Sequence, residues 1–242
     1  MEPDYYRQMA VLQSDHWWYE GRRAILASLT KTLSLPKGAQ ILEAGCGPGA
    51  NLTMLSCFGE LSAFEPDEFA SQHAAQISCV NVKTGTLPDQ IPFGQNFDLI
   101  GAFDVIEHID DDTAALKALR DQLKDSGYAL FTVPAHQWLW SHHDEINHHK
   151  RRYSRKSFKA ALERAGFHVE KISYYNMWLF PLAVAVRALK KLGGAREESD
   201  VSMPSPAVNK TLRSLFASER HLLKHINLPF GLSLIAVCKR QP

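Results

Sequence analysis

Cysteine is scarce in this 242-residue chain, and its four cysteines follow no metal-binding or disulfide pattern. They stand at Cys46, Cys57, Cys79 and Cys238, and no two of them are spaced as C-x-x-C. A disulfide framework and a zinc-ribbon site both need clustered cysteines, so the sequence argues against both. Free thiols in a reducing compartment are the simplest interpretation, and we expect a cytoplasmic protein.

An excess of charge of either sign is also lacking, because 27 Lys and Arg are matched by 26 Asp and Glu. A protein that binds nucleic acid through its overall field needs a clear basic excess, so no nucleic-acid partner is expected. One dense basic run is present, at Lys150, Arg151, Arg152, Arg155 and Lys156. Guanidinium groups suit phosphates and carboxylates, so we expect Arg151, Arg152 and the adjacent Tyr153 to bind an anionic part of a substrate.

Long apolar runs are missing as well. The longest, residues 177–186, is far shorter than the roughly 20 residues needed to cross a bilayer. The first residues lack the basic segment and apolar run of a signal peptide. The apolar segment 178–192 also carries Arg187, Lys190 and Lys191. Core packing, a homodimer contact and peripheral contact with the inner face of the membrane are its three interpretations.

The chain does contain short apolar runs that alternate with segments of helical period. Strands are expected at residues 40–44, 61–65, 80–83, 97–103 and 127–133, and helices at 21–33, 51–58, 67–77 and 111–124. Such alternation is typical of βαβ units, and it predicts a parallel sheet covered on both faces. Further along, Ser154 is expected to cap a helix that ends at Gly166, followed by strands at 169–175 and 232–238.

We expect a single domain over residues 1–242, since the length suits one elaborated domain. Its elaborations are an N-terminal helical segment at 1–36 and an apolar, helical insertion at about 176–226 before the last strand. Within that insertion, residues 193–206 are expected to form a linker and residues 207–225 a helix.

A glycine-rich loop follows the first predicted strand, at Gly45-Cys46-Gly47-Pro48-Gly49. Glycines let a backbone approach a ligand closely, so the loop indicates a nucleotide-like ligand, with an ordinary turn as the alternative. Its G-x-G-x-G spacing differs from the G-x-G-x-x-G of dinucleotide sites, which disfavours a nicotinamide cofactor. Glu43 at the loop entrance suits an ammonium group, and Glu65 lies about 20 residues after the loop, where a ribose-binding carboxylate is expected.

Three stretches together resemble class I S-adenosylmethionine-dependent methyltransferases: residues 41–49 (ILEAGCGPG), residues 64–67 (FEPD), and residues 97–109 (FDLI followed by DVIEHI). The resemblance implies a Rossmann-like three-layer α/β sandwich, whose seven-stranded, mostly parallel sheet has an antiparallel last strand. It also implies S-adenosylmethionine as the cofactor, with the glycines under its methionine part, Glu65 on its ribose and Asp104 facing its methionyl end. In many relatives an Asp after the third strand contacts the adenine, whereas this chain offers Thr86. The expected cofactor-binding set is Glu43, Gly45, Cys46, Gly47, Gly49, Glu65, Pro66, Thr86, Leu87, Asp104 and His108.

A histidine-rich connection follows the fifth predicted strand, with His136, His142, His143, His148 and His149. That position places it at the carboxyl edge of the sheet, where α/β folds bind their ligands. A hydroxyl acceptor needs a base near neutral pH, so His143, oriented by Asp144, is the first candidate and His149 the second. A histidine-rich surface loop is the plain alternative. A metal site of His143, Asp144, His148 and His149 is disfavoured, because adjacent residues rarely reach one ion, and no metal is expected.

Two patterns bear on the acceptor. His143-Asp144-Glu145 with His149 to Tyr153, and His16-Trp17-Trp18-Tyr19 with Arg22-Arg23, resemble a methyltransferase subfamily associated with polysaccharide and glycolipid biosynthesis. Trp18 is therefore a candidate to bind the acceptor, with packing of an N-terminal helix as the alternative.

The sequence thus predicts an S-adenosylmethionine-dependent methyltransferase that O-methylates a small-molecule, sugar or lipid-linked glycan acceptor. A catalytically silent cofactor-binding or scaffold protein and a nicotinamide-dependent oxidoreductase are the alternatives.

Overall fold

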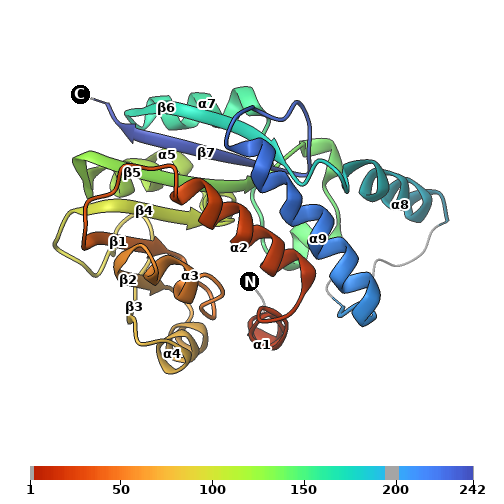
Figure 1. The fold of residues 1–242 in the computed structure, drawn as a ribbon, viewed down its shortest axis with the longest axis horizontal. Helices are drawn as coiled ribbons and strands as arrows, with labels where there is room; N and C mark the ends of the chain where they lie inside the picture. The colour runs from red at the N-terminus through yellow and green to blue at the C-terminus, as the bar shows by residue number, and fades with distance from the viewer. Residues whose placement is uncertain (1–2, 194–201, 242) are drawn as a thin grey trace.

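A single seven-stranded sheet organises the computed structural model, which describes residues 3–193 and 202–241 (Figure 1). The strand order is β3-β2-β1-β4-β5-β7-β6. Strand β7 runs antiparallel to both β5 and β6, and the other pairs are parallel. This arrangement confirms the predicted sheet with its antiparallel last strand. The strands are β1 (Ala39–Ala44), β2 (Gly59–Glu65), β3 (Asn81–Thr84), β4 (Phe97–Phe103), β5 (Leu123–Pro134), β6 (Phe167–Tyr175) and β7 (Ser233–Arg240).

Helices cover both faces of the sheet, which makes three layers (Figure 1). Helices α2, α3, α4 and α9 pack on one face, and α5 and α7 pack on the other. The helices are α1 (Pro3–Leu12), α2 (Trp17–Thr30), α3 (Leu52–Ser56), α4 (Glu68–Ile77), α5 (Asp112–Asp121), α6 (His142–Ile146), α7 (Arg155–Arg164), α8 (Phe180–Gly193) and α9 (Pro206–Leu223), with short 3₁₀ turns η1 (Ile106–His108) and η2 (Gln137–Leu139).

The core follows from the alternation of side chains along the central strands. Ile41 of β1 packs among residues of α2 and α9, whereas its neighbour Leu42 packs toward α5 and α7. Successive side chains of a strand point to opposite faces, so these two neighbours pack into the hydrophobic cores on opposite faces of the sheet. Every residue of β4 is buried, as expected for a central strand between two covered faces.

Several predicted elements have different ends in the structure. The helix expected over residues 111–124 ends at Asp121, because Leu123 already pairs with Phe97 at the start of β5. Helix α1 lies within the N-terminal segment that was expected to be helical, whereas α6, within the histidine-rich connection, was not predicted. The predicted cap of α7 is present, because the Ser154 side chain accepts a hydrogen bond from the Ser157 amide. Most of the linker expected over residues 193–206 lies outside the described residues.

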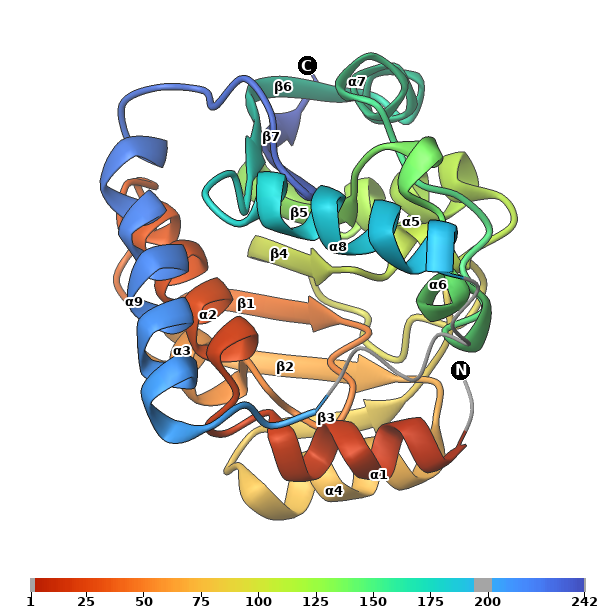
Figure 2. The same ribbon diagram turned by 90° about the vertical axis from the view of Figure 1, so that its right-hand side faces the viewer.

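The carboxyl ends of the parallel strands meet at one edge, and three later segments gather there. Helix α8 lies beyond these ends, and α6 lies beside it (Figures 1 and 2). Helix α1 packs along α4, next to the loop after β1 (Figure 2). None of the helices in residues 3–193 and 202–241 has the length and apolar content of a membrane span.

Candidate functional site

The glycine loop after β1 adopts the backbone that its sequence predicts. Gly45, Gly47 and Gly49 have φ angles of 68°, 54° and 99°, in the left-handed region that side chains rarely enter. A Cβ atom on Gly45 would lie 2.7 Å from a methyl group of Val105. The loop is therefore held close to the turn that follows β4, where Asp104 lies.

Glu65, at the end of β2, is bonded to this loop. Its Oε2 accepts a hydrogen bond from the Gly47 amide at 2.8 Å, and its Oε1 accepts one from the Asp67 amide at 3.2 Å. Oε1 also accepts from the Tyr6 hydroxyl of α1 at 2.9 Å. Burial raises the pKa of Glu65, and the backbone hydrogen bonds oppose that shift. Helix α1 therefore reaches the carboxylate expected to bind ribose hydroxyls, a contact that the sequence did not predict.

Glu43 supplies a second buried carboxylate at the base of the loop. It is 1% exposed, and its Oε1 accepts a hydrogen bond from the Asn51 side chain at 2.7 Å. Its Oε2 has no hydrogen-bond partner within the described residues. A buried carboxylate oxygen without a donor is costly, so it favours a ligand that brings N–H groups or positive charge. The ammonium group of S-adenosylmethionine fits this requirement.

Asp104 begins the turn after β4 and has a φ angle of 58°. Its backbone amide donates to the Thr132 carbonyl of β5 at 3.0 Å. Its carboxylate forms an ion pair with Arg22 of α2, and the Arg22 guanidinium lies 4.3 Å from the centre of the Trp18 ring. The structure thus brings Trp18 to the methionyl end of the expected cofactor site. Arg22 belonged to the N-terminal sequence pattern but had no predicted role.

The residues expected near the adenine follow β2 and β3, which lie on the opposite side of β1 from β4. The Thr86 backbone exchanges two hydrogen bonds with Gln90, and its side chain is exposed. Leu87 is partly buried against the core, and Pro66 is exposed next to Glu65. Cys46 is buried within the loop and packs with α3 and α4.

The histidine-rich connection is organised by Asp144, which is fully buried in α6. Its carboxylate accepts two hydrogen bonds from Arg152, at 2.7 and 2.9 Å, and one from the Ser141 amide at 2.8 Å. It also pairs with His149 Nδ1 at 2.8 Å. These donors hold the pKa of Asp144 well below its usual range, although burial opposes them.

This geometry corrects the predicted pairing, since Asp144 orients His149 instead of His143. The His143 ring lies 6.2 Å from that of His149, and its Nε2 is 3.3 Å from the Asn147 side-chain nitrogen. His143 belongs to the first turn of α6, where its side chain projects on a different side of the helix from Asp144.

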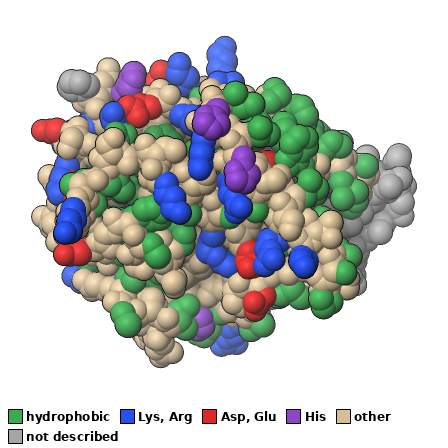
Figure 3. All heavy atoms as spheres, in the orientation of Figure 1, with side chains coloured by type: hydrophobic (Ala, Val, Ile, Leu, Met, Phe, Trp, Pro, Cys, Tyr) green, Lys and Arg blue, Asp and Glu red, His purple; other side chains and the backbone are tan. Residues whose placement is uncertain are grey.

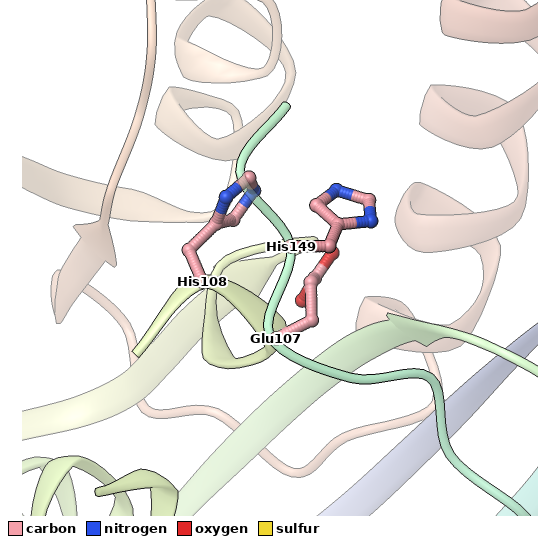
Figure 4. Close-up of side chains that lie close together, drawn as sticks. All are labelled: Glu107, His108 and His149. Carbon is pink, nitrogen blue, oxygen red and sulfur yellow. The ribbon is translucent and has the colours of Figure 1, made fainter. Parts of the chain in front are cut away.

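His149 instead meets two residues of η1, Glu107 and His108 (Figure 4). The His108 and His149 rings are 4.6 Å apart in an edge-to-face arrangement. Burial, and then the neighbouring His149, lower the pKa of His108 to about 3. Burial also raises the pKa of Glu107 well above its ordinary value, with Asp104 as the next contribution. Glu107 was not among the residues predicted from the sequence, although it stands in the same DVIEHI motif as Asp104 and His108.

The residues expected to bind an anionic substrate have partners within the fold. Arg152 is held by Asp144, and Arg151 pairs with Asp112 at 3.0 Å. The Tyr153 hydroxyl donates to the same Asp112 at 2.7 Å, and the Tyr153 ring packs in the core. These contacts join the basic run to α5 and α6.

Comparisons with known proteins identify the family to which this fold belongs. Residues 17–172 match the model of a family described as methyltransferase domain. The chain belongs to this methyltransferase family. The match confirms the prediction of a methyltransferase with S-adenosylmethionine as its cofactor, and it argues against the nicotinamide alternative. A comparison with curated proteins found no match.

Solved structures with the same fold include other methyltransferases. One is a methyltransferase from Haloferax volcanii solved with the Trm112 activator, at 16% identity and a TM-score of 0.64, covering 99% of this chain and 96% of that one. Another is an S-adenosylmethionine-dependent methyltransferase from Clostridium acetobutylicum, at 11% identity and a TM-score of 0.59, covering 99% and 98%. A third is phosphoethanolamine N-methyltransferase 2 from Haemonchus contortus with S-adenosyl-L-methionine, at 16% identity and a TM-score of 0.60, covering 90% and 52%.

The stability of the methyltransferase is expected to depend on pH through Glu43. Burial raises the pKa of Glu43 from 4.5 to about 7, while Asn51 and Arg22 oppose the shift and Glu65 adds to it. An acid with a raised folded-state pKa stabilises the fold fully below its unfolded-state pKa, and this contribution is lost as the pH rises through the folded-state pKa. Relative to Glu43→Gln, the unliganded protein should therefore lose up to about 3 kcal/mol between about pH 4.5 and pH 8. Urea unfolding of both proteins at several pH values measures this difference, and parallel pH profiles would contradict it.

Proposed function

We propose that this methyltransferase transfers a methyl group to a hydroxyl oxygen of a sugar or glycan-type acceptor, and that His149 helps to activate that hydroxyl. The pairing of His149 with buried Asp144, beside the η1 turn that follows Asp104, is the observation that carries this proposal. The Lys150 amide donates to the Glu107 carbonyl at 2.8 Å, which holds the histidine segment against the turn after β4. We therefore expect the activating group to lie next to the methionyl end of the proposed cofactor site.

Methyl transfer to oxygen needs alignment and the loss of one proton. The acceptor oxygen forms a bond to the methyl carbon, the carbon–sulfur bond breaks, and the sulfur keeps the electron pair as a thioether. The hydroxyl proton passes from the acceptor oxygen to Nε2 of His149, whose Nδ1 is paired with Asp144. Alignment is the main catalytic demand of an in-line displacement, and a neighbouring polar group assists the proton loss. The linked side chains of Asp104, Arg22 and Trp18 can hold the acceptor in line with the methyl group. His149 is the polar group that assists the proton loss.

The acceptor class is supported by aromatic side chains at the same edge. Trp138 is 62% exposed, and it contacts Phe180 of α8, which in turn contacts Phe230. Figure 3 shows hydrophobic side chains gathered over this part of the surface. Aromatic rings with exposed faces suit sugar rings and the headgroup region of a membrane. We therefore favour a lipid-linked glycan, presented at the inner face of the membrane.

An acceptor screen tests this class. The protein should release S-adenosylhomocysteine with lipid-linked glycans more rapidly than with the same glycans lacking the lipid, and Trp138→Ala should reduce that preference severalfold. Leu215→Ala, an exposed residue of α9 outside this surface, is the matched control. Equal rates on free and lipid-linked glycans would argue against the membrane-facing interpretation. A change in oligomeric state with Trp138→Ala would indicate that this surface is a homodimer contact instead.

Two histidine variants test the activating residue. His149→Ala should lower the rate of methyl transfer by about 100-fold or more, a loss in the range of acid–base contributions, with S-adenosylhomocysteine affinity unchanged. His143→Ala should retain most of the activity, because Asp144 does not orient this ring. Turnover on a hydroxyl acceptor, with cofactor affinity measured by calorimetry, separates the two effects. Loss of activity in His143→Ala alone would restore the prediction made from the sequence.

A further inference from the structure

Three side chains with metal-binding atoms converge beside the turn after β4. One ligand-type atom from each of Glu107, His108 and His149 lies within 4.8 Å of the other two (Figure 4). Glu107 is 0% exposed, and neither of its carboxylate oxygens has a hydrogen-bond partner within the described residues. A carboxylate that is buried without donors is among the costliest groups in a protein interior. Arg152 and Arg22 act on Glu107 electrostatically but donate no hydrogen bond to it, so a cation bound at this point would satisfy the carboxylate.

The orientation of His149 matches that of a metal ligand. Its Nδ1 pairs with Asp144 at 2.8 Å, which fixes the proton there and leaves the lone pair of Nε2 available. Arg152 and the Ser141 amide hold the Asp144 carboxylate in turn. A carboxylate behind a histidine is the usual outer-shell arrangement at metal centres, where it sets the tautomer and aims the ring.

The scaffold around the three residues comes from two segments that are bonded together. Glu107 and His108 belong to η1, and His149 follows α6. The Lys150 amide donates to the Glu107 carbonyl, and the His149 amide donates to the Asp144 carbonyl at 2.9 Å. Bonds of about 2.0–2.2 Å to one ion need ligand atoms about 3–4 Å apart. Side-chain rotations that move each ligand atom by about 1 Å would bring the three atoms from within 4.8 Å of one another to this distance.

We infer that Glu107, His108 and His149 form a binding site for one divalent transition-metal ion. Two imidazoles and one carboxylate suit zinc, and leave a coordination position for an oxygen atom. The inference that the ion binds does not depend on which acceptor is methylated. Its role, which rests on the proposed function, is to bind the acceptor hydroxyl and favour loss of its proton to solvent water, with His149 as a ligand in place of a free base.

Metal titration of the untagged, full-length protein tests this site. After treatment with a chelator and dialysis, the protein should bind one equivalent of Zn²⁺ by calorimetry. Co²⁺ should bind at the same stoichiometry, with the visible absorption of a low-symmetry site. Glu107→Gln and His149→Ala should each lower the affinity at least tenfold. His142→Ala is the matched control, because His142 lies in the same connection and its ring faces Glu145 at the surface.

The outcomes separate this inference from the proposed function. S-Adenosylhomocysteine binding, measured on every variant, reports whether the fold is intact. If His149→Ala does not fold, Glu107→Gln still tests the site, because glutamine has nearly the same size as glutamate. Substoichiometric binding by the wild type, or equal affinity in Glu107→Gln and His142→Ala, would overturn the metal site. If the protein binds no metal and His149→Ala still loses turnover, His149 is a base and the proposed function stands. If one metal ion binds but no hydroxyl acceptor is methylated, the metal site stands and the proposed function fails.

Discussion

Replacing Asp144 with alanine is expected to destabilise the fold by about 3–5 kcal/mol, the usual cost of leaving a buried charge without its partner. The Asp144 carboxylate is fully buried and accepts hydrogen bonds from Arg152 Nε and Nη2. The Arg152 side chain is only 5% exposed, so its guanidinium cannot regain water when the carboxylate is removed. Equilibrium unfolding in urea, followed by circular dichroism, measures the loss.

Two further variants make this prediction specific. Glu145→Ala removes the adjacent carboxylate, whose side chain is 63% exposed and pairs with His142 at the surface. Such exposed pairs contribute little, so its effect should stay below about 1 kcal/mol. The double variant Asp144→Leu with Arg152→Met removes both charges and should recover much of the lost stability. An Asp144→Ala variant as stable as Glu145→Ala would show that the buried pair does not stabilise the fold.

Replacing Glu65 with glutamine is expected to weaken binding of S-adenosylmethionine and S-adenosylhomocysteine by about 10- to 100-fold. The expected loss is that of one or more charge-assisted hydrogen bonds to ribose hydroxyls, worth about 1.5–3 kcal/mol. Glu65 also holds the glycine loop through the Gly47 amide, so the amide side chain weakens both contacts. Calorimetry with S-adenosylhomocysteine measures the change directly.

The control for this prediction lies three residues further along the chain. Glu68 is exposed at the start of α4, where it accepts a hydrogen bond from Gln72, and Glu68→Gln should bind the cofactor normally. An analogue of S-adenosylhomocysteine without ribose hydroxyls should lose much less affinity in Glu65→Gln than S-adenosylhomocysteine itself does. A loss of affinity that is just as large with this analogue would assign Glu65 to loop structure and not to ribose binding.

The cofactor half of the site could be predicted because its residues are close in sequence to strand ends. In a parallel sheet the carboxyl ends of neighbouring strands lie at one edge, so the loop after β1 and Glu65 after β2 had to meet there. The G-x-G-x-G spacing of the loop then disfavoured a dinucleotide as the ligand. Tyr6 escaped prediction because it reaches Glu65 from a helix 59 positions away in sequence, and no local pattern encodes that contact.

The catalytic half could be located but not assigned. The sequence placed the histidines after β5, and the structure shows that their connection returns to the turn after β4 through the Lys150 amide. The choice between His143 and His149 depends on α6, a five-residue helix too short to leave a clear hydrophobic period. That helix turns Asp144 into the interior, toward Arg152 and His149.

By itself, then, the sequence of this methyltransferase determined the alternation of strands and helices, the glycine loop and the two carboxylates at the ends of β1 and β2. These features depend on local backbone preference and on alternation of apolar residues, both of which are written in neighbouring positions. Only the tertiary structure decided which polar side chains face one another: Arg22 with Asp104, Arg152 with Asp144, and Glu107 with His108 and His149. Such pairs are set by the packing of segments far apart in the chain, where burial forces each charge to find its partner.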